Sequence, residues 1–386
     1  MQPLAVFDAD SHLFERPNLW ADHIDPKHRD LALRIETDEL GHPWLMHGDR
    51  RLMLTWISEP GNYESIGDLI GDHREGRPAR FDYARDLPAS HWDPAVRRDC
   101  LDGWGVEESV CFPQWGINWE LWLGEDLTSL RANMAAWNRW AATVRQEGRG
   151  RLHPVGHLSL RGDLDWLEGQ LAFLDAHDIR LAMMSTGLVD GRRLSHPDLD
   201  AAWSLFERYG VTPTFHVGGP SLTGLVDPAW VANDDMDYMP MLSFPLHGFD
   251  AQLALSDLVL NGVLARHPDL RIAVVELLSR WLVDLTFRVD AAYGTYRRIS
   301  GHRLLELPER PSDYLRRQVR VSAFAAEKPG ALMEQLGPIL MFGGDFPHPE
   351  GYASPLAEYQ AKAGETLPDD VAAAFYGGNL AELLHR

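Results

Sequence analysis

Two stretches at opposite ends of the chain decide the fold: residues 4–12 (LAVFDADSH) and residues 339–351 (ILMFGGDFPHPEG). Each is a short apolar run, long enough for one buried strand, that ends in acidic residues and histidine. Buried strands of this kind are typical of parallel sheets, and α/β barrels carry their chemistry where such strands end. If the first and last strands are neighbours, as in a closed barrel, these polar residues converge on one point.

Between these two stretches, short apolar runs alternate with longer helical patterns. Alternation on this scale predicts a parallel α/β sheet, and eight units favour a closed (β/α)8 TIM-like barrel. The eight predicted strands lie near 4–8, 108–113, 154–158, 179–184, 211–216, 271–276, 317–323 and 338–343. The predicted helices lie near 94–104, 126–147, 162–176, 197–209, 250–267, 279–298 and 327–336.

Two segments break the alternation, and we interpret both as insertions that shape the pocket. Residues 13–93, after the first strand, contain a predicted hairpin at 42–54 with Gly48 and Asp49 at its turn. Residues 218–249 follow the fifth strand. An insertion after a barrel strand lies on the catalytic face and can act as a lid. We therefore expect a single domain, 1–386, rather than two.

Composition restricts the partners. The 386 residues include 36 basic and 57 acidic side chains, a formal charge of −21, which disfavours nucleic acid and membrane surfaces. No apolar run is long enough to span a membrane. The two cysteines, Cys100 and Cys111, fit neither a zinc pattern nor a disulfide framework. These features predict a cytoplasmic protein with a small-molecule substrate.

The polar residues at the strand ends form a candidate metal site. Asp10 and His12 are two residues apart, so both side chains leave the same face of an extended chain. His216 ends the predicted fifth strand, and Asp345 follows the eighth. Four nitrogen and oxygen ligands from separate strands suit one divalent ion, Zn²⁺ or Mn²⁺. Asp8 lies one pleat repeat deeper and is predicted to orient a ligand.

Several motifs, in their order along the chain, carry a family resemblance. The chain resembles the amidohydrolase-2 family, the branch of the amidohydrolase superfamily that contains aminocarboxymuconate semialdehyde decarboxylase and the resorcylate-type decarboxylases. The resemblance covers nearly the whole chain. The motifs are 8–12 (DADSH), 215–216 (FH), 262–264 (GVL), 266–271 (RHPDLR), 276–281 (ELLSRW), 343–351 (GGDFPHPEG) and 378–380 (GNL).

The resemblance implies a (β/α)8 barrel with one catalytic divalent metal. It implies that Asp10 and His12 form the metal pair of the first strand, that His216 is the ligand of the fifth, and that Asp345 is the acidic residue near the metal. The chain departs from the semialdehyde decarboxylase at strand six, where Glu276 stands in place of a catalytic histidine.

Two reactions fit such a site. In a decarboxylase, Asp345 moves a proton to the carbon that loses CO₂. In a hydrolase of an amide, ester, lactone or C–C bond, Asp345 takes a proton from metal-activated water, and Glu276 or His348 protonates the leaving group. The residues do not choose between these reactions. The resemblance favours a carboxy-lyase acting on a small carboxylated aromatic or unsaturated compound.

The remaining expectations concern substrate and partner contacts. Arg280, which follows Glu276 at the start of a helix, is a candidate for binding an anion or for pairing with that carboxylate. His247, after the second insertion, is a candidate for the pocket. By analogy with similar barrels, we expect a homodimer. Two other interpretations stay open: a binding or scaffolding protein on a barrel that lacks chemistry, and a metal-free lactonase.

Overall fold

The computed structural model describes residues 4–116, 122–218, 241–299 and 306–385. Its parallel strands form two hydrogen-bonded runs. The first contains β1 (Phe7–Asp8), β2 (His12–Leu13), β6 (Glu108–Pro113) and β7 (Leu152–Pro154). The second contains, in spatial order, β8 (Gly156–His157), β9 (Leu181–Met183), β10 (Thr212–His216), β11 (Ile272–Val275), β12 (Val319–Ala323) and β13 (Leu340–Phe342).

Backbone contacts at two seams close these runs into a barrel. β7 pairs with β6 and β8 pairs with β9, and only Val155 separates β7 from β8, so together they form the third strand of the barrel. At the other seam, Ala9 N donates to Phe342 O at 2.9 Å, and His12 N donates to Phe346 O at 2.7 Å. The first and last strands are therefore neighbours, and the described residues confirm the predicted barrel.

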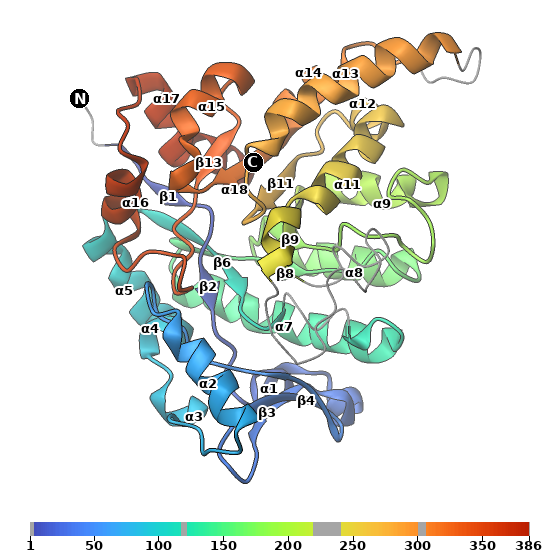
Figure 1. The fold of residues 1–386 in the computed structure, drawn as a ribbon. Helices are drawn as coiled ribbons and strands as arrows, with labels where there is room; N and C mark the ends of the chain where they lie inside the picture. The colour runs from blue at the N-terminus through green and yellow to red at the C-terminus, as the bar shows by residue number, and fades with distance from the viewer. Residues whose placement is uncertain (1–3, 117–121, 219–240, 300–305, 386) are drawn as a thin grey trace.

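Helices surround the strands (Figure 1). Aspartates cap several of their N-termini: Asp93 accepts from Ala95 N and Val96 N, which supplies partners to otherwise unsatisfied donors. The predicted helical segments correspond to α5 (Pro94–Trp104), α7 (Leu127–Glu147), α8 (Leu164–Ala176), α9 (Asp200–Tyr209), α11 (Phe249–Leu260), α12 (Val263–Arg266), α13 (Trp281–Ile299) and α15 (Pro329–Leu336). The sequence did not predict α14 (Pro311–Gln318), α16 (Pro355–Ala363), α17 (Asp369–Ala373) or α18 (Asn379–Leu384).

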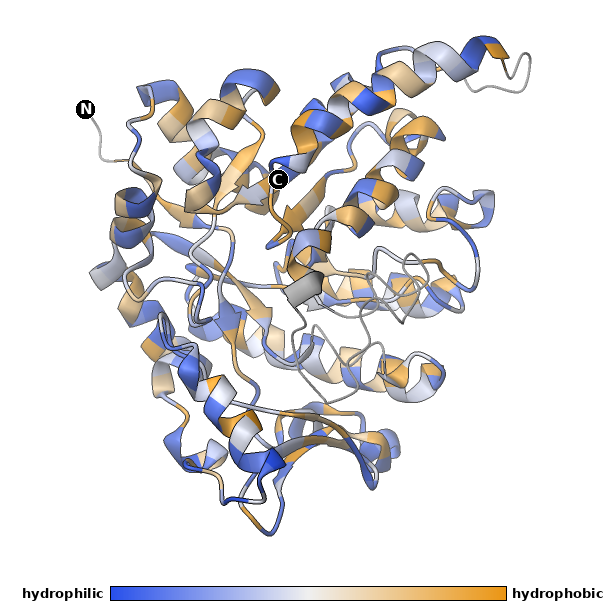
Figure 2. Cartoon of the chain, in the orientation of Figure 1, coloured by the Kyte–Doolittle hydropathy of each residue, from blue (hydrophilic) through white to orange (hydrophobic). Residues whose placement is uncertain are grey.

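Alternate residues of each strand pack into two different apolar layers. On β11, Ile272 and Val274 belong to the large cluster between strands and helices, whereas Ala273 and Val275 belong to the smaller cluster inside the barrel. Figure 2 shows the strands as mostly apolar ribbons enclosed by helices of mixed hydropathy. A strand that is apolar on both faces is the signature of a buried parallel sheet, which is why the runs were visible in the sequence.

The first insertion forms a small antiparallel sheet with its own apolar cluster. Its strands are β3 (Arg34–Thr37), β4 (Pro43–His47) and β5 (Arg50–Leu54), and the last two are the predicted hairpin. The sheet is accompanied by the helices α1 (Leu19–His23), α2 (Glu64–Arg74), α3 (Tyr83–Asp86) and α4 (Ala89–Trp92). Its apolar cluster includes Trp137 of α7, so the insertion packs on a barrel helix. That 1–386 forms a single domain stays a prediction.

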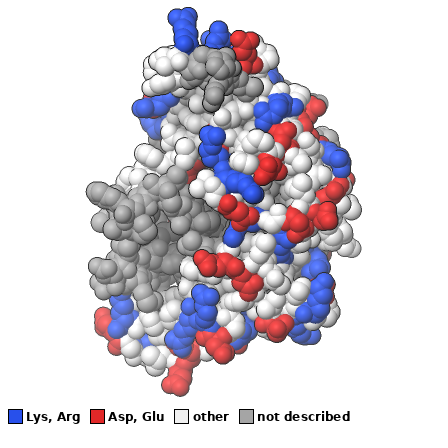
Figure 3. Space-filling model, turned by 90° about the vertical axis from the view of Figure 1, so that its right-hand side faces the viewer, with Lys and Arg blue, Asp and Glu red and all other residues white. Residues whose placement is uncertain are grey.

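Of the second predicted insertion, residues 219–240 lie outside the described residues. Met241–Leu246 form a short 3₁₀ helix, η3, that leads into α11. On the face drawn in Figure 3, acidic and basic side chains are interspersed. Among the described helices, none has the length and apolar character needed to cross a membrane.

Candidate metal centre

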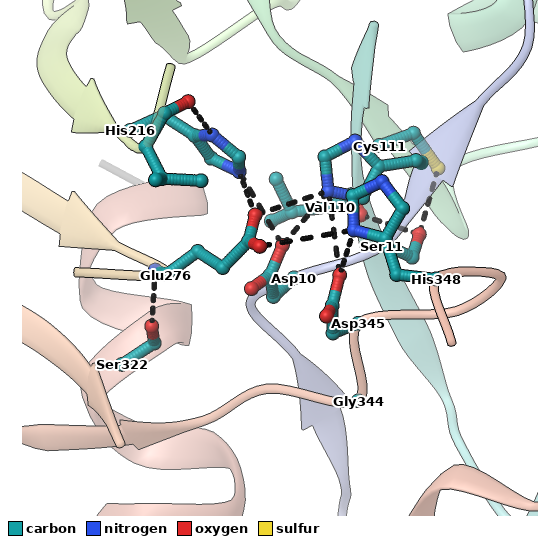
Figure 4. Close-up of polar contacts among 12 residues, drawn as sticks. Asp10, Ser11, Val110, Cys111, His216, Glu276, Ser322, Gly344, Asp345 and His348 are labelled. Carbon is teal, nitrogen blue, oxygen red and sulfur yellow. Dashed lines mark hydrogen bonds and ion pairs between the residues drawn. The ribbon is translucent and has the colours of Figure 1, made fainter. Parts of the chain in front are cut away.

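Five polar side chains from four barrel strands meet at the carboxyl ends of those strands. Asp10 lies between β1 and β2, His12 begins β2, His216 ends β10, Glu276 follows β11 and Asp345 follows β13. All five residues are buried. In Figure 4 the side chains of Asp10, His216, Glu276 and Asp345 point toward one another. The structure therefore brings together both ends of the chain, as the sequence predicted.

The distances among these side chains describe a compact cluster. His12 Nε2 lies 3.5 Å from Asp10 Oδ1, 3.5 Å from Asp345 Oδ1 and 3.6 Å from Glu276 Oε2. His216 Nε2 lies 3.6 Å from Asp10 Oδ1 and 3.3 Å from Glu276 Oε2. The ligand atoms form two overlapping groups, each with all its atoms within 4.8 Å of one another: Asp10, His12, His216 and Glu276, and His12, Glu276, Asp345 and His348.

One atom of each side chain is buried and has no hydrogen-bond partner among the described residues: Asp10 Oδ1, His12 Nε2, His216 Nε2, Glu276 Oε2 and Asp345 Oδ2. An unsatisfied buried polar group costs about 1–3 kcal/mol, and native proteins retain few of them. Five such atoms in two overlapping ligand groups indicate a bound partner. The atoms are imidazole nitrogens and carboxylate oxygens, which are the donors that Zn²⁺ and Mn²⁺ prefer.

The two histidines are held in the tautomer that a metal requires. Nδ1 of His12 lies 3.2 Å from Pro113 O, and Nδ1 of His216 lies 2.9 Å from Val217 O. A carbonyl oxygen accepts but never donates, so in each neutral ring Nδ1 carries the hydrogen. The lone pair of each Nε2 is then free and faces the cluster, an arrangement common among metal-binding histidines.

The backbone is strained where the acidic side chains enter the site. Glu276 has φ 59° and Asp345 has φ 52°, in the left-handed region that costs non-glycine residues about 1–3 kcal/mol. Val275 faces the barrel interior, so simple strand alternation would turn Glu276 outward. The left-handed residue redirects its carboxylate into the site, and Ser322 Oγ accepts from its backbone N–H at 3.0 Å.

Asp8 holds the first and last strands together beneath the cluster, in the orienting role predicted for it. Its Oδ1 accepts from Asp10 N at 3.0 Å and from Gly344 N at 2.7 Å. A Cβ at Gly344 would lie 2.7 Å from Asp8 Oδ2, so only glycine allows this approach. Burial raises the pKa of Asp8 to about 8 despite these two backbone hydrogen bonds.

The electrostatics favour either protons or a cation at the centre. Burial, followed by the neighbouring Asp10 carboxylate, raises the pKa of Asp345 well above its usual range. Burial and then Asp345 do the same to the pKa of Glu276. Burial and the nearby His348 ring lower the pKa of His12 to about 4, so its imidazole is neutral at pH 7. Carboxylates beside the neutral imidazole of His12 form a site that a divalent cation would neutralise.

His348 connects Asp345 to the second barrel strand. Its Nδ1 lies 2.6 Å from Asp345 Oδ1, and its Nε2 donates to Gln114 Oε1 at 2.9 Å. Gln114 was not predicted from the sequence. It lies two residues after Phe112, which faces the barrel interior, so strand alternation could have placed it there.

Arg97 is a second missed contributor. Its side chain is fully buried, and its Nη2 donates to the backbone carbonyl of His12 at 2.8 Å. Its Nε donates to Ser90 O at 2.7 Å. It therefore fixes the backbone of a candidate ligand from α5. No local sequence pattern distinguishes a buried arginine from an exposed one in an amphipathic helix, so the contact of Arg97 with His12 could not be predicted.

Two predicted substrate contacts lie outside the cluster. Arg280 is exposed, and its backbone N–H donates to Glu327 Oε1 at 2.9 Å. The ion pairs of the described residues do not join Arg280 to Glu276, so that suggested pairing is not present. His247 is half-buried; burial lowers its pKa, and Asp250 opposes the shift. A substrate role for either residue stays a prediction.

Solved structures share this architecture. An amidohydrolase from Mycobacterium avium subsp. paratuberculosis K-10 matches with a TM-score of 0.78, 22% identity, and coverage of 100% of both chains. The 5-carboxyvanillate decarboxylase of Sphingomonas paucimobilis matches at 0.66, 17% identity, and 99% of both chains. That of Novosphingobium aromaticivorans, complexed with manganese and 4-hydroxy-3-methoxy-5-nitrobenzoic acid, matches at 0.63, 16% identity, and 100% of this chain and 97% of the other.

No family model and no curated protein matches the chain. The structural matches nevertheless cover its whole length, and they include the kinds of protein that the sequence resemblance predicted. The fold is therefore a (β/α)8 TIM-like barrel, which these solved structures share. The cluster at the carboxyl ends of its strands lies where barrels of this type carry their chemistry.

Proposed function

We propose that this chain is a metal-dependent carboxy-lyase that removes CO₂ from a small carboxylated aromatic or unsaturated compound. The observation that carries the proposal is the set of five buried, unpartnered donor atoms in two overlapping ligand groups at the carboxyl ends of the barrel strands. Structural neighbours that are 5-carboxyvanillate and 2,6-dihydroxybenzoate decarboxylases support the choice of reaction.

The metal ligands in this proposal are Asp10, His12, His216 and Asp345, as predicted from the sequence. Glu276 Oε2 lies within 3.6 Å of both imidazole Nε2 atoms, so this carboxylate is a candidate for a further ligand. A site rich in carboxylates favours Mn²⁺ over Zn²⁺. The manganese bound in the structurally similar decarboxylase of Novosphingobium aromaticivorans supports the choice of Mn²⁺. When bound, the cation polarises substrate oxygens and stabilises negative charge.

Asp345 is the proposed proton donor. Its Oδ1 shares a proton with His348 Nδ1 at 2.6 Å, which leaves the unpartnered Oδ2 for the metal, and burial raises the pKa of this carboxyl group. In the reaction, this proton is transferred to the carbon that bears the substrate carboxylate. The bond between that carbon and the carboxylate then breaks, its electron pair restores the aromatic ring or double bond that accepted the proton, and CO₂ leaves. The sum is R–CO₂⁻ plus H⁺ giving R–H plus CO₂.

His348 is the proposed route by which Asp345 regains its proton. The 2.6 Å contact between His348 Nδ1 and Asp345 Oδ1 allows direct transfer, and Gln114 holds the ring in place through Nε2. Glu276 is the third proposed catalytic residue. Its Oε1 lies 3.8 Å from His348 Nδ1, so its carboxyl group stands beside the reacting groups. Burial raises its pKa, which favours the protonated form that can donate to the substrate carboxylate.

The direct test is decarboxylation in D₂O. The purified protein, loaded with Mn²⁺, is incubated with a panel of hydroxylated benzoates that includes 5-carboxyvanillate and 2,6-dihydroxybenzoate. The proposal predicts CO₂ release and a product with one deuterium at the carbon that lost the carboxylate. Turnover of the panel without CO₂, or CO₂ release that Asp345→Asn leaves unchanged, would contradict it.

Hydrolysis is the alternative, and one observation favours it: of the neighbours described above, the one with the largest TM-score is an amidohydrolase. The same metal and carboxylates would activate water for attack on an amide, ester or lactone. Reaction in H₂¹⁸O distinguishes the two activities. A hydrolase incorporates ¹⁸O into the acid product, whereas the decarboxylated product gains no oxygen.

We also propose a cytoplasmic homodimer. Cys100 and Cys111 are free, which suits a reducing compartment. Phe287, Tyr296 and Ile299 are 70%, 60% and 73% exposed along α13, and exposed apolar side chains on one helix are typical of an interface. Light scattering on the purified protein tests the dimer. A single monomeric mass across concentrations would refute it.

A further inference from the structure

A second cluster of metal-ligand types lies in the first insertion, apart from the barrel centre. Asp38 follows β3, His42 immediately precedes β4, and His73 lies in the last turn of α2. One candidate ligand atom from each residue lies within 4.8 Å of the others. In Figure 1, α2 lies next to β3 and β4, and the rings of His42 and His73 are 5.1 Å apart between centroids.

His42 supplies an independent sign that something binds here. Its side chain is fully buried, and neither ring nitrogen has a hydrogen-bond partner among the described residues. The nearest acceptor is Asp38 Oδ1, which lies 3.4 Å from Nδ1 and outside good hydrogen-bond geometry. Even a shortened contact to Asp38 would satisfy only one of the two nitrogens. A buried polar group without a partner costs about 1–3 kcal/mol, so a structural role alone does not account for this histidine.

The other two residues are arranged as ligands. Asp38 is fixed by three donors: its Oδ1 accepts from the backbone N–H groups of Leu40 and His42, and its Oδ2 accepts from Trp44 Nε1, each at 3.0 Å. Hydrogen-bonded carboxylates of this kind are usual around metal ions. The His73 ring stands nearly perpendicular to the His42 ring, at 77°, with the two centroids 5.1 Å apart.

We propose that Asp38, His42 and His73 bind one divalent transition-metal ion, with zinc as the best fit. Two imidazoles and one carboxylate leave a fourth tetrahedral position for water, a donor set that zinc accepts. The ion links the loop between β3 and β4 to the end of α2. Its role is to fasten the insertion, and it takes no part in the reaction at the barrel centre.

The first test is zinc stoichiometry. Protein stripped by a chelator is dialysed to equilibrium against micromolar Zn²⁺, and bound zinc is measured by elemental analysis. His73→Gln should bind one equivalent less than the wild type. His177→Gln is the matched control, because His177 also lies at the end of a helix but is exposed and outside the cluster. Zinc bound at the barrel centre contributes equally to all three proteins, so the difference in bound zinc between variants reports only on the cluster of Asp38, His42 and His73. Equal stoichiometry in all three proteins would overturn the proposal.

The second test uses a variant that should bind more tightly. Arg51 Nη1 lies 3.7 Å from Asp38 Oδ2, and its guanidinium lies over the Trp44 ring. Its positive charge opposes a cation at the site. Arg51 is half exposed, so Arg51→Gln should fold even if His73→Gln does not. In competition with a chromophoric zinc chelator, Arg51→Gln should lower the Kd of this site by at least threefold. An unchanged Kd would overturn the proposal.

Discussion

Asp345 Oδ1 and His348 Nδ1 lie 2.6 Å apart, and His348 Nε2 donates to Gln114 Oε1. Because Nε2 carries a hydrogen, the short contact contains one proton held between the carboxylate and the ring. Asp345 also lies 3.5 Å from His12 in the metal cluster. The same carboxyl group therefore faces both the proposed metal and a proton route.

Asp345→Asn should abolish turnover, because an amide neither donates the proton nor holds a cation as a carboxylate does. We expect at least a ~10³-fold loss of kcat, within the range for removal of an acid-base group. Steady-state kinetics measure the effect, and circular dichroism checks the fold. Asp178→Asn is the matched control: Asp178 also has a positive φ, 54°, but lies at the end of α8, away from the site. Activity of Asp345→Asn near the wild-type value would remove it from the mechanism.

His12→Ala and His216→Ala should each lower manganese occupancy, since each removes an imidazole nitrogen that faces the cluster. The loss of affinity should be at least ~10-fold, the size of effect that even residues supporting a metal ligand produce. Elemental analysis after dialysis against Mn²⁺ measures it. His153→Ala is the control, because His153 is buried but contacts Glu108 at 2.6 Å, away from the cluster. Full occupancy in both ligand variants would disprove the assignment.

Glu276→Gln should reduce rate more than stability. The carboxylate lies in the cluster, so we expect kcat to fall by about 10²-fold while the melting temperature changes little. Glu327→Gln should show the reverse, because Glu327 accepts from the backbone N–H groups of Ser279, Arg280 and Phe324 and has no contact with the cluster. Normal kcat together with a large fall in melting temperature for Glu276→Gln would make it a structural residue.

Glu15 should make stability depend on pH. Its carboxylate is fully buried and accepts from Trp115 N and Gly116 N. Burial raises its pKa from 4.5 to about 7. The folded chain therefore binds this proton more tightly than the unfolded chain. Its contribution to stability is complete below pH 4.5 and is lost as the pH rises to about 7, by about 3 kcal/mol in all.

Urea unfolding at pH 5 and pH 8 measures this contribution. The free energy of unfolding of the wild type should fall more between the two pH values than that of Glu15→Gln, whose amide does not titrate. Comparing the two proteins cancels the other groups that titrate in this range, such as Asp8. Parallel pH dependence in the two proteins would show that Glu15 does not titrate as described.

Much of the barrel could be predicted, because its strands are apolar on both faces and its helices have marked ends. Residues 108–113 and 94–104 form β6 and α5 with the predicted bounds. The missed elements are mostly short. α3 and α4 have four residues each and depend on tertiary contacts, since helices of that length are unstable alone. α14 was missed because residues 317 and 318, predicted as the start of a strand, belong to that helix.

The site was predictable where sequence spacing and strand ends coincide, as at Asp10, His12, His216 and Asp345. The sequence predicted Glu276 near the pocket. Its position between His12 and His216, however, depends on its own left-handed backbone conformation, which residue spacing does not reveal. Arg97 lies in the helix before the second strand, and Gln114 directly follows that strand. Their contacts join residues more than eighty positions apart, which only the folded chain brings together.

The most direct test of the metal centre is anomalous diffraction from a crystal grown with Mn²⁺. We predict one strong manganese peak about 2 Å from Asp10 Oδ1, His12 Nε2, His216 Nε2 and an oxygen of Asp345. Such a peak would show that a metal ion is the missing partner of the buried, unpaired atoms at the barrel centre. A crystal saturated with Mn²⁺ that shows no peak among these side chains would contradict the account and leave only the barrel.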